Sequence, residues 1–270
     1  MGDVLKAIIL GIIQGLTEFL PVSSSGHLEI GQEILNFDLG EEDLLFTIVV
    51  HFATVLSTIV VFRKEILDLI KGAFQFKWNQ ETEYIAKILI SMIPVAIIGV
   101  FFKDQVEAFF KDQITLVGAM LLVTAFLLYL TKHAKAAQAG VEGKSTSFKD
   151  AFIIGIAQAV AVMPGISRSG STIATGLLLG VDKNKIAKFS FLMVLLPIIG
   201  ITILDVKDLV ETGANTASYG PLLAGFFGAF LSGWAACTWM LDIVKKGKLI
   251  YFAIYCAIVG TIAIAYGLLL

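Results

Sequence analysis

The sequence predicts an all-α polytopic membrane protein: six transmembrane helices plus two re-entrant helical hairpins in an inverted-topology repeat. Three observations lead to this prediction. Of 270 residues, 57% are hydrophobic and 16% are charged, and the mean hydropathy is +0.87, whereas a soluble domain carries about 25% charged residues. Long apolar runs fill the chain, and two further apolar regions are broken by similar polar strings. A soluble enzyme and a disordered chain are therefore excluded.

Six apolar runs are long enough to cross a bilayer, which takes roughly 20 helical residues. They are residues 44–62, 84–102, 114–131, 186–204, 219–241 and 249–270. Residues 4–36 and 148–181 differ, because polar sequence interrupts them after Pro21 and Pro164. The piece after each break has about ten residues and spans roughly 15 Å as a helix, half of a bilayer core. Each region is therefore expected to be a re-entrant hairpin, whose loop lines a wet cavity or is buried in protein.

The two broken regions also resemble each other. At an offset of 144, residues 6–28 align with 150–172 without a gap, and eight of the 23 positions are identical. Similar composition explains some matches, but not the Gln, Ser and Gly matches around the breaks. We therefore expect a single membrane domain, 1–270, made of repeats at about 1–136 and 145–270 with a linker at about 137–144. Each repeat has three spans, an odd number, so the repeats enter the membrane with opposite orientation.

Positive charge predicts the orientation. The loops 63–83, 132–149, 182–188 and 242–248 hold fourteen Lys and Arg residues, against four on the other side. The side richer in these residues faces the cytoplasm. Both termini and the opening of the first hairpin are therefore expected on the external side of the membrane, which is the periplasmic side if the membrane is a bacterial plasma (inner) membrane.

Other bulk features say less. The net charge is −2, so no basic surface indicates a nucleic-acid partner. Cys237 and Cys256 lie in apolar runs and indicate neither a disulfide framework nor a metal site. Residues 1–20 lack the features of a cleaved signal peptide.

Few ionisable or reactive side chains lie within the predicted membrane segments, and such residues are functional candidates by default. Gln14 and Glu18 are four apart and share a helix face, so together they are candidate ligands for Mg²⁺ or Ca²⁺ beside substrate phosphates. Ser24 and His27 follow at the start of the next half-helix, where a serine within reach of a histidine base could act as an activated nucleophile. With Arg168 of the second hairpin, these are the candidate catalytic residues.

The same tips are suited to a phosphate. Arg offers a planar fork to phosphate oxygens, and helix N-termini offer backbone N–H groups. The candidate phosphate-binding residues are Arg168, Ser23, Ser25, Ser167, Ser169, Gly26, Gly170 and Thr172. Three of these residues have an alternative role. Ser23 and Ser25 also suit helix capping, and Arg168 also suits a structural ion pair with Glu18. His51, in the middle of a span, is expected to be a packed histidine hydrogen-bonded across helices.

Residues 14–27 (QGLTEFLPVSSSGH) and 164–172 (PGISRSGST) resemble the two signature motifs of the bacterial undecaprenyl-diphosphate phosphatases, the bacitracin-resistance family. Chain length, span count and motif separation agree with the family as well. The resemblance implies hydrolysis of undecaprenyl diphosphate to undecaprenyl phosphate and inorganic phosphate. This reaction recycles the lipid carrier for peptidoglycan synthesis and confers bacitracin resistance. The resemblance also implies a divalent metal. Gln14 stands at a position where the family has Glu or Gln, so this chain has one anionic metal ligand fewer than members with Glu there.

The mechanistic prediction is that Ser24 attacks the terminal phosphorus with His27 as its base. The alternative is direct attack by His27, and the spacing does not separate the two. The expected partners are the polyprenyl diphosphate and the bilayer, with a homodimer as an option. An alternative function is a transporter or flippase for a phosphorylated lipid, because inverted repeats with broken helices also build transporters. A Ser–His pair beside a carboxylate favours the enzyme over the transporter and over a purely structural module.

Overall fold

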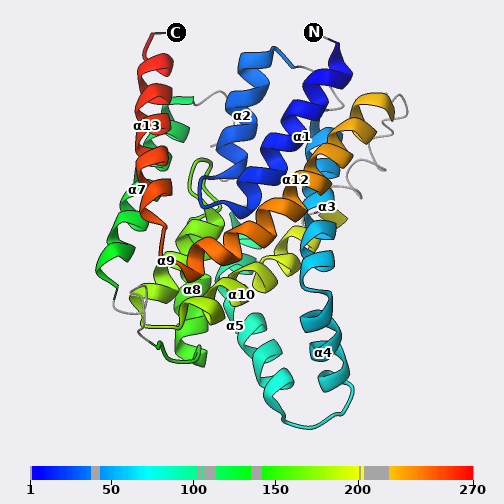
Figure 1. Cartoon of the computed structure of the whole chain (residues 1–270), viewed down its shortest axis with the longest axis vertical. Helices are drawn as coiled ribbons and strands as arrows, with labels where there is room; N and C mark the ends of the chain where they lie inside the picture. Colours follow the sequence, from blue (N-terminus) through cyan, green and yellow to red (C-terminus); the bar gives the residue numbers. More distant parts are fainter. Residues whose placement is uncertain are drawn as a thin grey trace.

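The computed structural model describes residues 2–37, 43–102, 105, 114–134, 142–200, 202–203 and 219–269, and all its regular elements there are helical. Figure 1 shows their arrangement. The first half contains α1 Asp3–Phe19, α2 Ser24–Leu35, α3 Asp43–Val61, α4 Arg63–Ala73, α5 Gln80–Phe101, α7 Ile114–Leu130 and the 3₁₀ turn η2 Thr131–His133. The second half contains α8 Phe148–Val160, α9 Arg168–Leu178, α10 Lys183–Met193, α12 Tyr219–Lys245 and α13 Ile250–Gly267. The prediction of an all-α chain is confirmed.

Several helices can cross a membrane by length and composition. Four do so alone: α5, Ile114–His133, α12 and α13. A fifth candidate is the pair Leu45–Val61 and Arg63–Ala73, which is bent by 77°. Among the described residues of the predicted span 186–204, the helical pattern is interrupted at Val194, directly after α10. Most of the predicted linker 137–144 lies outside the described residues.

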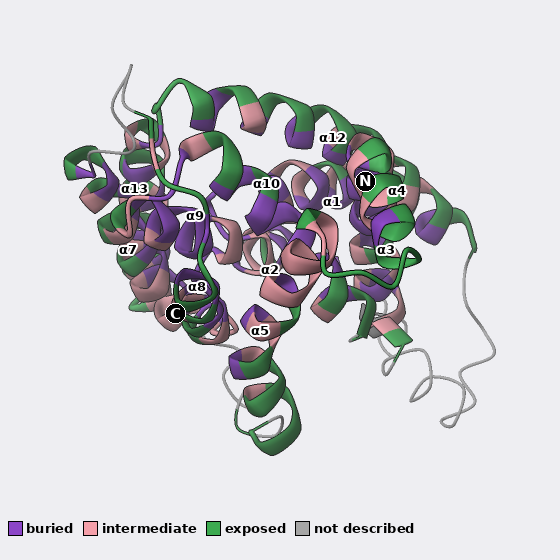
Figure 2. Cartoon of the chain, turned by 90° about the horizontal axis from the view of Figure 1, so that it is seen from below, coloured by how far each residue is buried: buried purple, intermediate pink, exposed green. Residues whose placement is uncertain are grey.

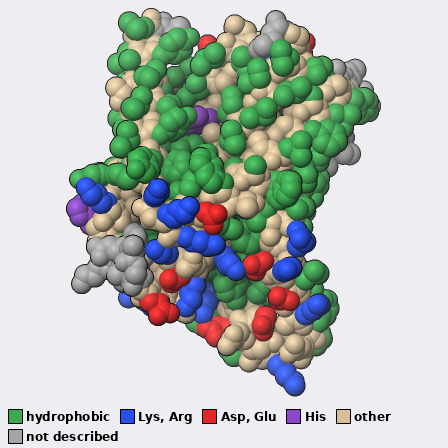
Figure 3. All heavy atoms as spheres, viewed as in Figure 1, with side chains coloured by type: hydrophobic (Ala, Val, Ile, Leu, Met, Phe, Trp, Pro, Cys, Tyr) green, Lys and Arg blue, Asp and Glu red, His purple; other side chains and the backbone are tan. Residues whose placement is uncertain are grey.

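The surface agrees with a membrane protein. Figure 3 shows hydrophobic side chains covering the upper part of the molecule, with Lys, Arg, Asp and Glu gathered near the lower end. Large apolar side chains are exposed on the outer helices, for example Val100 at 74% and Leu231 at 57%. Figure 2 shows buried residues in the interior, around α10. Since soluble monomers rarely expose such large apolar patches, this surface is suited to lipid.

Both predicted breaks are present. α1 ends at Phe19, and α2 begins at Ser24, where Ser23 caps the helix by accepting a bond from the Gly26 N–H at 3.4 Å. A helix usually ends at or before the residue preceding a proline, which accounts for the end of α1 before Pro21. Ser23 has a φ of 70°, a costly conformation for a non-glycine residue that clusters at functional sites.

The second break repeats this local geometry. α8 ends at Val160 and α9 begins at Arg168, where the Ser167 hydroxyl accepts a bond from the Gly170 N–H at 3.0 Å. In the intervening loop, Gly165 has a φ of 89°, and a Cβ there would lie 2.4 Å from the Val117 carbonyl oxygen. Only glycine suits this position, because it tolerates positive φ and presents no side chain to α7.

The tips of the two broken segments touch each other. The Ser169 hydroxyl donates to the Leu20 carbonyl at 3.4 Å. A Cβ added to Gly170 would lie 3.1 Å from the Pro21 Cβ, and one added to Gly26 would lie 3.3 Å from the Gly165 Cα. The convergence expected from the sequence is therefore observed, and small residues make it sterically possible.

Close glycine contacts join each broken segment to a long helix of the other half. α1 packs along α12, and α8 packs along α5. A Cβ on Gly11 would lie 2.2 Å from the Gly225 carbonyl oxygen, and one on Gly155 would lie 2.3 Å from the Ser91 carbonyl oxygen. Gly11 and Gly155 are one of the identical pairs at the 144-residue offset, so the same packing device occurs in both halves.

We expect Gly11→Ala and Gly155→Ala each to lower the free energy of unfolding by about 1–3 kcal/mol, the usual cost of overpacking. Gly99→Ala is the control, because a Cβ there meets nothing within 4 Å and alanine has the higher helix propensity. Thermal unfolding in detergent measures all three. A Gly11→Ala protein with wild-type unfolding would contradict the α1–α12 packing.

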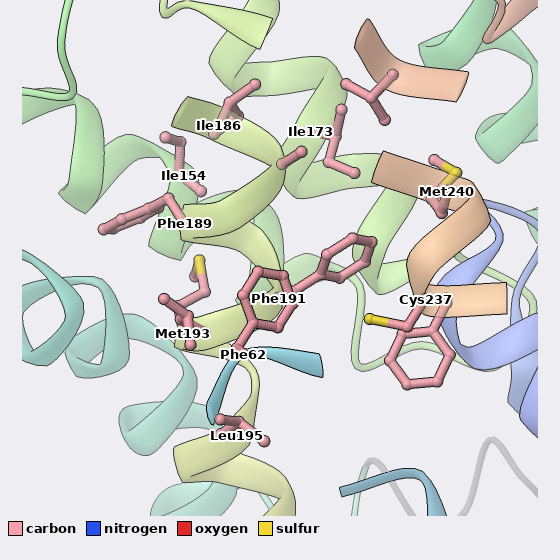
Figure 4. Packing of buried hydrophobic residues seen from close by; sticks show 14 of the residues in the cluster. Phe62, Ile154, Ile173, Ile186, Phe189, Phe191, Met193, Leu195, Cys237 and Met240 are labelled. Atoms are coloured by element: carbon pink, nitrogen blue, oxygen red, sulfur yellow. The ribbon is translucent and has the colours of Figure 1, made fainter. Parts of the chain in front are cut away.

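A hydrophobic core lies directly beside the broken segments (Figure 4). Phe191 of α10 packs edge-on against Phe19, with ring centroids 5.8 Å apart, and contacts Phe62 at 6.1 Å. Ile154, Ile173 and other apolar residues of α8, α9 and α12 complete the cluster. Because Phe19 adjoins Glu18, this core supports the polar residues at the tips.

Candidate active site

Glu18 receives hydrogen bonds from two other predicted site residues. It lies in the last turn of α1, with its side chain 7% exposed. Its Oε2 accepts from the Ser24 hydroxyl at 2.6 Å and from the Gln14 amide Nε2 at 3.0 Å. The Ser24 bond has the short length of a hydroxyl bound to an ionised carboxylate. Ser24 is the first residue of α2, so the break after α1 turns its hydroxyl back toward Glu18.

His51 of α3 adds a third group at this carboxylate. Its Nε2 lies 4.0 Å from the Glu18 Oε2, and its Nδ1 donates to the Thr47 carbonyl at 2.8 Å. The expected hydrogen bond across helices is thus replaced by a bond within α3 and a 4.0 Å contact with the Glu18 carboxylate. His51 therefore has an electrostatic link to the site, which its position in a mid-membrane span did not reveal.

A small cavity of about 20 Å³ lies between the two halves. It has room for roughly one water molecule. Its polar lining contains four predicted residues, Glu18, Arg168, Ser169 and Thr172, together with four that were not predicted, Thr54, Thr58, Gln158 and Ser190. The structure therefore brings the carboxylate of the first tip and the guanidinium of the second to one polar volume.

His27 is engaged away from Ser24. Its Nδ1 donates to the Ser23 carbonyl at 2.8 Å, so in the neutral ring Nε2 accepts from the Tyr255 hydroxyl at 2.9 Å. The two rings are stacked, with centroids 5.5 Å apart. The Ser24 hydroxyl donates to Glu18 instead. The Ser24–His27 pairing inferred from spacing is therefore not formed in this structure.

The predicted phosphate-binding residues divide into two groups. Ser23 and Ser167 cap their helices by accepting from the Gly26 and Gly170 N–H groups. The Ser25 and Ser169 hydroxyls lie 3.4 Å from the Ser23 and Ser167 hydroxyls, respectively. In the cavity, the Thr172 Oγ1 lies 2.6 Å from the Ser190 Oγ and accompanies Ser169 and Arg168. Helix capping thus accounts for Ser23 and Ser167. In contrast, Arg168, Ser169 and Thr172 of α9 line the cavity.

Few metal-ligating side chains surround Glu18. Within the described part of the chain, no group of three or more His, Cys, Asp or Glu side chains is placed to hold a metal ion. The Gln14 Oε1, however, is buried without a hydrogen-bond partner beside Glu18. One carboxylate and one amide oxygen fit Mg²⁺, which is commonly held by one or two carboxylates plus substrate phosphates.

Sequence reasoning missed the polar residues contributed by distant helices. They are Tyr255 on α13, Ser190 on α10, and Thr54 and Thr58 on α3. An isolated hydroxyl in an apolar helix carries no sequence signal of its own. Gln158 did carry one, because it matches Gln14 in the repeat.

The chain matches a known protein family over most of its length. The family model described as "Bacitracin resistance protein BacA" matches residues 7–262. The chain is 60% identical over 267 residues to an undecaprenyl-diphosphatase of Parabacteroides distasonis, with 98% of both chains covered. It is 58% identical to one of Bacteroides fragilis, with 96% of both covered, and 43% identical to one of Carboxydothermus hydrogenoformans, with 94% of both covered. The chain therefore belongs to the bacitracin resistance protein BacA family.

Proposed function

We propose that this chain is an undecaprenyl-diphosphatase, a membrane hydrolase that converts undecaprenyl diphosphate to undecaprenyl phosphate and inorganic phosphate. The activity recycles the lipid carrier for cell-wall synthesis and confers bacitracin resistance. The observation that carries the proposal is the 2.6 Å bond between Ser24 and Glu18, next to the cavity that Glu18 shares with Arg168. Together they provide a nucleophile, a proton acceptor and a phosphate-binding cation.

In the first step, the Ser24 oxygen attacks the terminal phosphorus. The bond from that phosphorus to the bridging oxygen breaks, and undecaprenyl phosphate leaves. Glu18 takes the Ser24 proton, because its Oε2 already accepts that hydroxyl, which is the usual activation of a serine nucleophile. Arg168 binds the phosphate oxygens and stabilises the negative charge, as phosphoryl transfer requires.

In the second step, water attacks the phosphorus of the phosphoserine, the bond from phosphorus to the Ser24 Oγ breaks, inorganic phosphate leaves, and Glu18 returns the proton to Ser24. His27 lies on the same face of α2, three residues from Ser24. The Ser23 carbonyl and Tyr255 orient its ring. We propose that the His27 Nε2 accepts a proton of the attacking water once the Tyr255 hydroxyl has released this nitrogen. Direct attack by His27 is the alternative, and a phosphohistidine would distinguish it.

A divalent cation, Mg²⁺ or Ca²⁺, is part of the proposal. Glu18 and the Gln14 Oε1 would hold it together with the substrate phosphates. The cation would neutralise phosphate charge, the role that metals have in phosphoryl transfer. In addition to the cation, the Arg168 guanidinium would supply positive charge from the protein to the phosphates.

For the membrane arrangement, we propose six spans and two re-entrant hairpins in an inverted repeat. Three observations support the repeat: the matching serine caps, the contacts between the tips, and the matched packing of Gly11 on α12 and Gly155 on α5. α1 begins and α13 ends at the same end of the molecule, opposite the end where charged side chains gather (Figures 1 and 3). The termini and the site opening would then face the periplasm.

Cysteine labelling tests this topology. In a background with Cys237 and Cys256 replaced, Gly2→Cys is expected to react with an impermeant maleimide added to intact cells. Gln75→Cys, in the turn between α4 and α5, is expected to react only after the inner membrane is opened. The reverse pattern would place the site opening on the cytoplasmic side.

The activity itself is tested by phosphate release from undecaprenyl diphosphate by the purified full-length protein in detergent. We expect release, loss of release in EDTA, and recovery when Mg²⁺ or Ca²⁺ is added in excess. Retention of full activity in EDTA would contradict the metal proposal alone. A folded wild-type protein that releases no phosphate would favour the transporter alternative.

A further inference from the structure

Gln158 is a buried amide that the structure leaves without partners. It lies near the end of α8 and is 1% exposed. Neither its Nε2 nor its Oε1 has a hydrogen-bond partner. The residue lines the polar cavity together with Glu18 and Arg168. A buried donor and a buried acceptor therefore border the cavity, and both are free to bind a ligand.

The internal repeat shows what Gln158 lacks. Its counterpart Gln14 donates its Nε2 to Glu18, four residues further along α1. Four residues after Gln158, at the position equivalent to Glu18, stands Val162. The second half thus keeps the glutamine without the carboxylate that accepts its donor in the first half.

Packing does not explain a glutamine here. Leaving a buried polar group unpaired is unfavourable, and an apolar side chain of similar shape avoids that cost. α8 already buries apolar residues such as Ile154 beside this position. A polar amide at position 158 is consistent with a role in which a ligand supplies the missing hydrogen bonds.

The surroundings define the ligand. Arg168 contributes a guanidinium, which only donates, beside the unpaired Gln158 Nε2, whereas the Ser169 and Thr172 hydroxyls already donate to the Leu20 and Arg168 carbonyls. Such a donor set suits the oxygens of a phosphate. The cavity of about 20 Å³ fits one water molecule, and therefore also fits one phosphate oxygen pointing into it.

We infer that Gln158 is a further phosphate-binding residue, whose Nε2 donates to an oxygen of the terminal phosphate that Arg168 holds. This inference rests on the proposed function and adds to it a residue from the second half. Gln158 binds both the substrate's terminal phosphate and the inorganic phosphate product. Its role differs from that of Gln14, which is occupied by Glu18.

The test compares Gln158→Leu and Gln158→Glu with the exposed Gln75→Leu as control, in full-length protein purified in detergent. Inhibition by inorganic phosphate, KM, kcat and thermal unfolding are measured. For Gln158→Leu we expect about 10- to 100-fold weaker phosphate inhibition, the size of a hydrogen bond to a charged group, with an unfolding temperature equal to or above wild type. Gln158→Glu is expected to weaken inhibition further, because its carboxylate repels phosphate. Gln75→Leu is expected to match wild type.

Three results would overturn the inference. One is phosphate inhibition of wild-type strength in Gln158→Leu. Another is a marked fall in the unfolding temperature of that variant, which would make Gln158 a structural residue. The third is a fall in kcat with unchanged phosphate inhibition, which would assign the amide to the attacking water. Failure of the proposed function appears differently, as absence of phosphate release from the wild-type protein.

Discussion

Arg168→Ala is expected to reduce phosphate release from undecaprenyl diphosphate by about a thousandfold or more. Arg168 is the first residue of α9 and faces the cavity shared with Glu18. In the proposed mechanism its guanidinium binds the phosphate oxygens and stabilises charge in the transition state, and such preorganised donors are worth roughly 10²–10³-fold each. The measurement is kcat/KM in detergent. KM is expected to rise, because the ground-state diphosphate loses its cation as well.

Two variants control this result. Arg168→Lys keeps the positive charge but loses the planar fork, so intermediate activity is expected. Arg63→Ala removes an exposed arginine at the start of α4 that donates to the Val60 carbonyl of α3, and it is expected to behave as wild type. If Arg168→Ala retained activity and instead unfolded more easily, Arg168 would be a structural partner of Glu18.

Ser24→Ala is expected to lower kcat by about 10⁴-fold or more, because removing the nucleophile of a covalent mechanism abolishes the main pathway. Its Cβ remains compatible with the start of α2, so the fold is expected to persist. Rapid quenching of wild-type protein with diphosphate labelled in its terminal phosphate is expected to trap phosphoserine at residue 24. Protein mass spectrometry locates the label.

Glu18→Gln tests the proton acceptor. Its amide keeps the size of the side chain but cannot take the Ser24 proton, so a large loss of kcat is expected while Ser24 stays in place. Ser145→Ala, which removes an exposed hydroxyl bonded to Lys185, is the control and is expected to match wild type. Full turnover by Ser24→Ala, or a label trapped on His27, would contradict the serine mechanism.

The fold was largely predictable from local sequence. α1 ended just before Pro21 and α8 ended four residues before Pro164, and Ser23 and Ser167 capped the next half-helices. These features depend on residues close in sequence, through proline geometry and side-chain bonds to nearby N–H groups. The predicted span 44–62 ended where the charged residues Arg63, Lys64 and Glu65 begin, close to the bend after Val61, but the helix α4 within the expected loop 63–83 was not predicted.

The site was predictable in part. Glu18, Ser24 and Arg168 were found because polar residues are costly within a membrane and stand out there. The partners of His27 and Ser24 were not predicted correctly from spacing. A separation of three residues allowed a Ser24–His27 hydrogen bond. In the structure, however, the His27 imidazole is hydrogen-bonded to Tyr255, more than 200 residues away, and the Ser24 hydroxyl donates to Glu18.

Composition, breaks and internal repetition in the sequence were enough to define the class of protein, the position of both half-helix junctions and the charged groups near the site. These properties follow from hydropathy and short-range hydrogen bonding. Which groups touch was decided only by folding. The Ser24–Glu18 bond depends on how α2 folds back onto α1, the approach of His51 depends on the packing of α3 against α1, and the cavity shared by Glu18 and Arg168 depends on helices from both halves. Contacts across such sequence distances depend on how whole helices pack, as the glycine contacts between α1 and α12 illustrate.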